Sequence, residues 1–158
     1  MRSIRLTLLA GLLAGCNALS APAAVRATLD EVEALRYDCG EGLADNVPSG
    51  LFQWKCSGTV AGHRAIVDVE GNDDGVVGLT LDISSVDPTF TRAEFQRLAN
   101  SVSLLRAEPG LVGALDTWSG VQNPVRVGAA RVNGECDATQ CIVFIGFRDG
   151  PVQPDSSG

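Results

Sequence analysis

The sequence predicts an α+β fold with a single, mainly antiparallel sheet of about five strands and two helices packed on one face. The chain has 158 residues, the length of one domain. It is 45% hydrophobic and 20% charged, a composition typical of globular proteins. Segments of alternating apolar and polar residues and segments of helical spacing follow one another in the order helix, three strands, helix, two strands.

The chain divides into one domain and short flanking segments. We expect residues 1–15 to be a signal peptide, residues 16–27 a tether, residues 28–149 the α+β domain and residues 150–158 a flexible polar tail. No internal sequence repeat is visible, so we expect a single hydrophobic core.

The first helix is expected to begin at Thr28. Thr28 and Glu31 have the spacing of a capping box, in which two side chains bond the free N–H groups of a helix start. An apolar stripe follows, and Cys39-Gly40 ends the helix because glycine tolerates the conformation of a helix C-terminus. The stripe consists of Leu29, Val32 and Leu35.

Three strands of an antiparallel meander follow the loop of residues 40–50. Residues 52–60 alternate apolar with polar side chains, and Cys56 is in phase with the buried positions. Tight turns are predicted at residues 61–63 and 71–75. The inward residues of the next two strands are Ala65, Val67, Val69, Val77, Leu79, Leu81 and Ile83, and the outward ones are Arg64, Asp68, Glu70, Thr80 and Asp82.

The second helix is expected to pack on the apolar face of this meander. Asp87-Pro88 ends the third strand, and Thr91 with Glu94 forms a second capping box. Residues 111–115 are predicted to form another short helical turn. The apolar face of the second helix consists of Phe95, Leu98, Ala99, Val102 and Leu105.

Two further strands complete the predicted sheet. Residues 125–132 form the fourth, with a bulge expected near Ala129-Ala130. Residues 142–147 form the fifth, which is apolar on both faces and is therefore expected in the interior of the sheet. The loop between them is bounded by Cys136 and Cys141, which indicates a hairpin closed by a disulfide.

The N-terminal segment has the features of an export signal. Arg2 and Arg5 precede an apolar run over residues 6–15, which as a helix of about 15 Å is too short to span a bilayer. The run ends in Leu13-Ala14-Gly15-Cys16, which closely resembles the lipobox of bacterial lipoproteins. The resemblance implies cleavage before Cys16, a diacylglyceryl group on its sulfur and usually an acyl chain, such as palmitate, on its new amino group. Several acyl chains hold a protein firmly at a membrane lipid surface.

Two observations refine the location. Asn17 stands where an Asp commonly retains Gram-negative lipoproteins in the inner membrane, so the resemblance favours the periplasmic side of the outer membrane in such a cell. The alternative is ordinary secretion, because residues 21–23 before Ala24 have the small side chains of a signal-peptidase site; this would leave a soluble, secreted or periplasmic protein. Loss of residues 1–15 takes the net charge from −7 to −9, which argues against nucleic-acid binding.

The four remaining cysteines are expected to form two disulfides, since an even number is typical of disulfide pairing in exported chains. Three pairings are open. We favour Cys39–Cys56 with Cys136–Cys141, because neighbours in sequence close small loops; the first bond would then attach the first helix to the sheet. The alternative is four reduced, buried thiols. The sequence has no C-x-x-C motif and one histidine, so it predicts neither a metal site nor a cofactor.

Three other features were candidates for function. The only histidine, His63, lies in a predicted turn and is expected to have no catalytic role. The acidic turn at Asp73 and Asp74 loosely matches the first half of a calcium loop, but Leu81 stands where a calcium loop requires Glu, so a solvated turn is expected. Trp118, in a glycine-containing loop, is either an exposed anchor for a partner or a side chain folded over the edge of the core.

The sequence contains no catalytic motif. We therefore expect a non-enzymatic, membrane-anchored binding or accessory module of the cell envelope. Its partner is expected to be another envelope protein, bound through the solvent face of the sheet or the Trp118 loop. The alternatives are a small envelope hydrolase of unfamiliar type, which would need a deep pocket with convergent titratable groups, and an enzyme inhibitor with a rigid protruding loop, such as residues 136–141.

Overall fold

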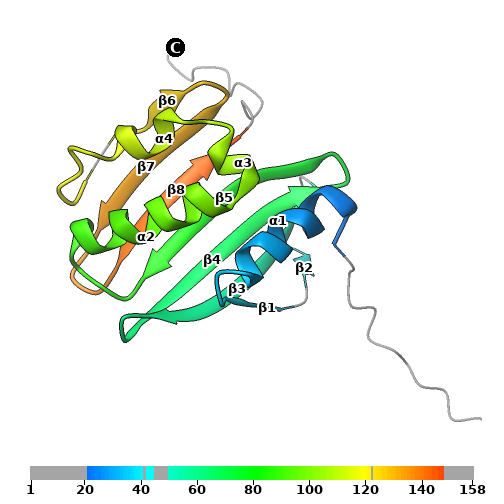
Figure 1. Ribbon diagram of the computed structural model, residues 1–158, viewed down its shortest axis with the longest axis horizontal. Coiled ribbons are helices and arrows are strands. Elements are labelled where there is room, and N and C mark those ends of the chain that lie inside the picture. The colour runs from blue at the N-terminus through cyan, green and yellow to red at the C-terminus, as the bar shows by residue number, and fades with distance from the viewer. Residues whose placement is uncertain (1–20, 41, 45–49, 122, 148–158) are drawn as a thin grey trace, which may run out of the picture.

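A computed structural model of the chain describes residues 21–40, 42–44, 50–121 and 123–147. These residues form one antiparallel sheet of eight strands with four helices (Figure 1). The α+β class and the single antiparallel sheet are confirmed. The sequence underestimates the number of elements because the additional helices and strands are short, and short elements carry no periodic pattern.

The first half of the sheet is the predicted meander. It consists of β3 (Phe52–Val60), β4 (His63–Asn72) and β5 (Gly75–Ile83), and the bounds of β3 agree with the prediction. Two short strands that the sequence did not predict, β1 (Asp38–Cys39) and β2 (Leu43–Ala44), both pair with β3 at the outer edge.

The second half contains a hairpin where one bulged strand was predicted. β6 (Val125–Val127) and β7 (Ala130–Cys136) pair antiparallel, and the chain reverses at Gly128, whose φ of 56° glycine adopts without strain. β8 (Cys141–Gly146) lies between β5 and β7, so its predicted interior position is confirmed. The strand order is β1-β3-β4-β5-β8-β7-β6, which means that two meanders meet at their last strands.

The first helix, α1 (Ala23–Glu33), begins five residues before the predicted start of the domain. Pro22 occupies its N-cap, and Thr28 lies buried in the middle of the helix, so the capping box predicted there is wrong. The helix also ends earlier than predicted, because the chain turns at Arg36, a non-glycine residue with a φ of 70°. Cys39 consequently lies in β1 and not at the end of a helix.

The second helix, α2 (Pro88–Ser101), begins at the proline that was expected only to end the sheet. The Asp87 side chain accepts a hydrogen bond of 2.8 Å from the backbone N–H of Thr89 and caps the helix. The predicted capping box of Thr91 and Glu94 is wrong, because both residues lie buried inside the helix.

Two short helices, α3 (Ser103–Arg106) and α4 (Gly110–Ala114), lead from α2 to β6. Val102 is extended and separates α2 from α3, so the single helix predicted through this region is interrupted. The carboxylate of Glu31 accepts hydrogen bonds from the backbone N–H of Ser103, at 2.8 Å, and from its hydroxyl. Glu31, a residue of α1, thus caps the start of α3. The other short helix, α4, corresponds to the helical turn predicted at residues 111–115.

The core lies between the helices and one face of the sheet. Val77, predicted to point inward, is only half-buried because it lies beside an irregularity where β4 and β5 change register. The buried residues on the inner face of β4 and β5 are Ala65, Val67, Val69, Leu79, Leu81 and Ile83, and those of the helices include Leu29, Val32, Phe95 and Leu98.

Candidate functional site

One face of the sheet carries all the helices, and the other face is left without a covering element among the residues that the structure describes (Figure 1). We call this second face the open face. Side chains alternate between the two faces along each strand, so the residues of the open face are those that alternate with the core residues. They are Gln53, Lys55, Ser57, Thr59, Arg64, Ile66, Asp68, Glu70, Thr80, Asp82, Arg126, Arg131, Asn133, Glu135, Ile142 and Phe144.

The strand register arranges the centre of the open face in two rows that cross five strands. One row is Ser57, Ile66, Asp82, Ile142 and Glu135; the other is Lys55, Asp68, Thr80, Phe144 and Asn133. The first row places Ile66 and Ile142 beside charged residues, and the second places Phe144 between the polar side chains of Thr80 and Asn133. Phe144 is 36% exposed, more than the large apolar residues of the inner face.

Asp68 lies at the middle of the open face in an environment that disfavours its charge. One carboxylate oxygen, Oδ1, is buried and has no hydrogen-bond partner. Burial raises the pKa of Asp68, and the charge of Asp82 raises it further, while the opposite Lys55 lowers it. A carboxylate of this kind gains stability when a donor from another molecule reaches it.

Asp82 occupies the neighbouring row, beside Ile66 and Ile142. Burial is the main cause that raises its pKa, and the charge of Asp137 adds to it; Arg64 and Lys55 act in the opposite direction. Negative charge is therefore concentrated where β5 meets the β7–β8 hairpin.

A shallow cavity of about 220 Å³, which we call the hairpin pocket, lies at this end of the open face. Val121 forms an isolated bridge with Glu135 and is 79% exposed, which makes it a strongly exposed apolar side chain. The pocket is lined by Val121, Glu135, Cys136, Asp137, Gln140 and Ile142.

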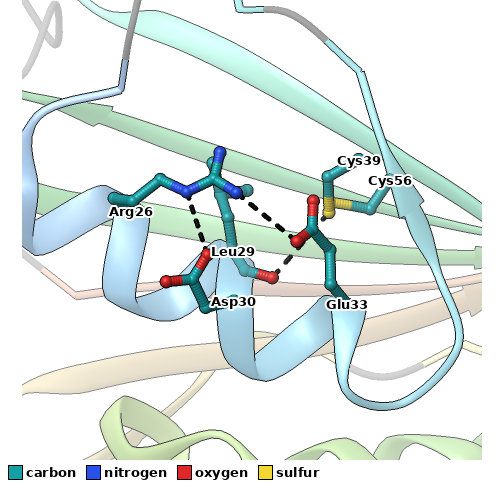
Figure 2. Close-up of a disulfide and its surroundings, with 6 residues drawn as sticks. All are labelled: Arg26, Leu29, Asp30, Glu33, Cys39 and Cys56. Carbon is teal, nitrogen blue, oxygen red and sulfur yellow. Dashed lines mark hydrogen bonds and ion pairs between the residues drawn. A yellow bond between two sulfur atoms is a disulfide. The ribbon is translucent and has the colours of Figure 1, made fainter.

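The Cys39–Cys56 disulfide is present, as the favoured pairing predicts. It joins β1 to β3 and not a helix to the sheet, which corrects the expected attachment. Figure 2 shows the bond beside α1, where Cys39 Sγ lies 3.9 Å from the carbonyl oxygen of Leu29. On the outer side of α1, Arg26 pairs with Asp30 at 2.9 Å. The disulfide therefore fixes the edge of the sheet beneath the helix.

The second predicted disulfide, Cys136–Cys141, is also present and closes the β7–β8 hairpin. Within its loop, Asp137 Oδ1 accepts hydrogen bonds from the backbone N–H groups of Thr139, at 2.7 Å, and Gln140, at 2.9 Å, and from the Thr139 hydroxyl. These bonds lower the pKa of Asp137. The loop thus holds a charged carboxylate in a fixed position at the pocket.

Trp118 is only 5% exposed, so the structure supports the second of the two interpretations, a side chain folded over the edge of the core. Its indole packs directly on Gly134, where an added Cβ would lie 2.7 Å from Trp118 Cε2. The hypothesis that Trp118 is an exposed anchor for a partner therefore does not fit this conformation. Of the two binding surfaces expected from the sequence, the open face of the sheet remains.

The other two sequence candidates have local structural roles. His63 Nδ1 lies 2.9 Å from the carbonyl oxygen of Ser84, which requires the ring to donate from that nitrogen, and its ring packs against Phe90. In the acidic turn, the side-chain oxygen of Asn72 accepts from the backbone N–H of Asp74 at 2.9 Å. Asn72 is therefore used by the turn itself, as in an ordinary Asx turn.

A buried polar network was missed at the level of sequence. The Tyr37 hydroxyl donates to Glu94 Oε1 at 2.8 Å, and Arg97 donates to both carboxylate oxygens, at 2.8 and 2.5 Å. Burial, together with the Glu94 carboxylate, raises the pKa of Tyr37. The sequence feature that could have indicated this network is the position of Glu94, a charged residue on the apolar stripe of α2. The Tyr37, Glu94 and Arg97 side chains bond to one another, so the network joins α2 to the chain after α1.

Cys16 and the signal segment lie outside the described residues. Within the described part of the chain, no helix has both the length and the apolar character needed to cross a membrane. Comparisons with known protein families, curated proteins and solved structures gave no significant match.

Proposed function

We propose that the chain is a lipid-anchored module of the cell envelope that binds another protein through the open face of its sheet and performs no catalysis. The observation that carries this proposal is the uncovered face itself, where Phe144 is 36% exposed and the half-buried Ile142 stands between Asp82 and Glu135. Partly exposed apolar side chains with a polar surround are typical of protein-binding surfaces.

The lipobox ending in Cys16 supports the anchor. Cleavage at the competing site before Ala24 would cut within α1 and remove the Pro22 carbonyl, which accepts a hydrogen bond of 2.8 Å from the Arg26 N–H. Six residues separate Cys16 from α1, and even fully extended this tether spans at most about 25 Å. Mass spectrometry of the mature protein should find a lipid-modified N-terminal Cys16; an unmodified N-terminus at Ala24 would refute the anchor.

The chemistry of the open face favours binding over catalysis. The hairpin pocket is smaller than the roughly 300 Å³ at which typical small-molecule sites begin. Its Asp137 has a lowered pKa, which makes this carboxylate a weak general base and a poor general acid. The loop between Cys136 and Cys141 is short and tied to itself, so it offers little for an inhibitor to insert into an enzyme.

Site-specific photo-crosslinking in cells that express the full chain tests the binding surface. Benzoylphenylalanine in place of Phe144 should give a discrete adduct with a partner protein. The matched control places the same group at Asp30, whose side chain is 59% exposed on α1, on the opposite side of the sheet. No adduct from position 144, or the same adduct from both positions, would refute the proposal.

A further inference from the structure

The hairpin pocket is lined by both apolar and polar residues and has room for one side chain. Val121, Glu135 and Ile142 stand next to one another across the strands, so the carboxylate of Glu135 is flanked by an apolar side chain on each side. A cavity of about 150 Å³ is enough for a benzene molecule. The pocket, at about 220 Å³, therefore accommodates a long side chain from outside.

The charge around the pocket is negative. Glu135 and Asp137 line it, and Asp82 stands beside Ile142 at its inner rim. The basic groups that act on Asp82 are Arg64 and Lys55, which lie on β4 and β3, on the side away from the pocket. The ion pairs Arg26–Asp30, Arg26–Glu33 and Arg97–Glu94 lie on α1 and α2 and involve neither Glu135 nor Asp137.

We propose that the hairpin pocket binds a lysine or arginine side chain of the partner protein, an inference that rests on the proposed protein-binding function. Lys and Arg combine an apolar stem with a cationic head. This matches a lining in which Val121 and Ile142 stand on either side of Glu135 and Asp137 adds a second carboxylate. A metal ion fits less well, because the described residues contain no group of three or more His, Cys, Asp or Glu arranged to hold one. Phosphate-bearing lipid headgroups are repelled by the same carboxylates.

Fluorescence anisotropy with two labelled pentapeptides tests the proposal on the full chain. The probes are acetyl-Val-Arg-Val-Arg-Val-amide and the matched acetyl-Val-Glu-Val-Glu-Val-amide. We expect saturable binding of the arginine peptide only, and a loss of affinity of at least fivefold in Glu135→Gln. Asp73→Asn removes the same charge from the distant β4–β5 turn and should change affinity less than twofold. Circular dichroism verifies that both variants are folded.

Three results would overturn the inference: no binding of the arginine peptide, equal binding of the glutamate peptide, or unchanged affinity in Glu135→Gln. Displacement of the peptide by an equal concentration of spermidine would also overturn it, because the pocket would then select free polyamines and not a protein side chain. The crosslinking experiment at Phe144 does not depend on charge. An adduct there without peptide binding would refute the basic-side-chain inference alone, whereas failure of both experiments would refute the binding function as well.

Discussion

Replacing Tyr37 with Phe removes a single hydroxyl from the buried network and leaves the ring in place. The hydroxyl donates at 2.8 Å to Glu94, a residue that is only 4% exposed. A hydrogen bond to a charged group contributes about 1.5–3 kcal/mol. Because the two Arg97 bonds to the same carboxylate remain, we expect the lower part of this range, about 1.5–2 kcal/mol, in the free energy of unfolding.

Urea unfolding followed by tryptophan fluorescence measures this loss, since Trp54 and Trp118 are both buried. The midpoint should fall with an unchanged slope, and the melting temperature should fall by roughly 5–10 °C. Glu94→Gln and the double variant complete a cycle, in which we expect a coupling energy of at least about 1 kcal/mol. Coupling below about 0.5 kcal/mol would refute the view that the two side chains stabilise the fold as a pair.

Three other predictions concern stability. Replacing Cys39 and Cys56 together with Ala should cost about 3 kcal/mol, the value for a closed loop of 17 residues, and a loss under about 1 kcal/mol in urea unfolding would contradict this. Gly134→Ala forces a methyl group against Trp118 and should cost about 1–3 kcal/mol with a shift in fluorescence emission; unchanged emission and stability would disprove the contact. The raised pKa of Asp82 means that the folded state binds the proton more tightly than the unfolded state, so stability is lost as pH rises above the ordinary value near 3.8. Asp82→Asn should therefore raise the free energy of unfolding at pH 7, with a gain that shrinks toward pH 3, and a loss at pH 7 would show that attraction to Arg64 outweighs burial.

Elements with a long periodic pattern were predictable from the sequence, as β3 shows. Its nine residues alternate without interruption, and the predicted bounds agree with the structure. The turn at Ala61-Gly62 was predictable for a related reason, since it requires positive φ at both residues and glycine provides one of them at no cost. The disulfide pairing was favoured from the sequence because neighbouring cysteines close small loops, although three pairings were open.

The two predicted capping boxes were wrong, because a capping pattern is local and the partners of these two glutamates are distant. Glu31 and Glu94 each stand three residues after a threonine, as in a capping box. In the folded chain, Glu31 bonds Ser103, 72 residues away, and Glu94 bonds Tyr37, 57 residues away. A pattern of four residues contains no information on such contacts.

The open face was predictable in part. Alternation along β4 and β5 identified Arg64, Asp68 and Asp82 as outward residues before their neighbours were known. The pairing of β5 with β8, which brings Ile142 beside Asp82, depends on the whole topology. The hairpin pocket also depends on the bridge between Val121 and Glu135, which leaves no signal in either segment.

The order of the disulfides has a consequence for how the protein is made. The first cysteine of the four pairs with the second, and the third with the fourth, so each bond lies within one half of the sheet. A chain that emerges N-terminus first exposes Cys39 and Cys56 to an oxidant before Cys136 has appeared. Oxidation in order of emergence would give the native bonds directly, so we expect the reduced chain to reach them without a disulfide isomerase.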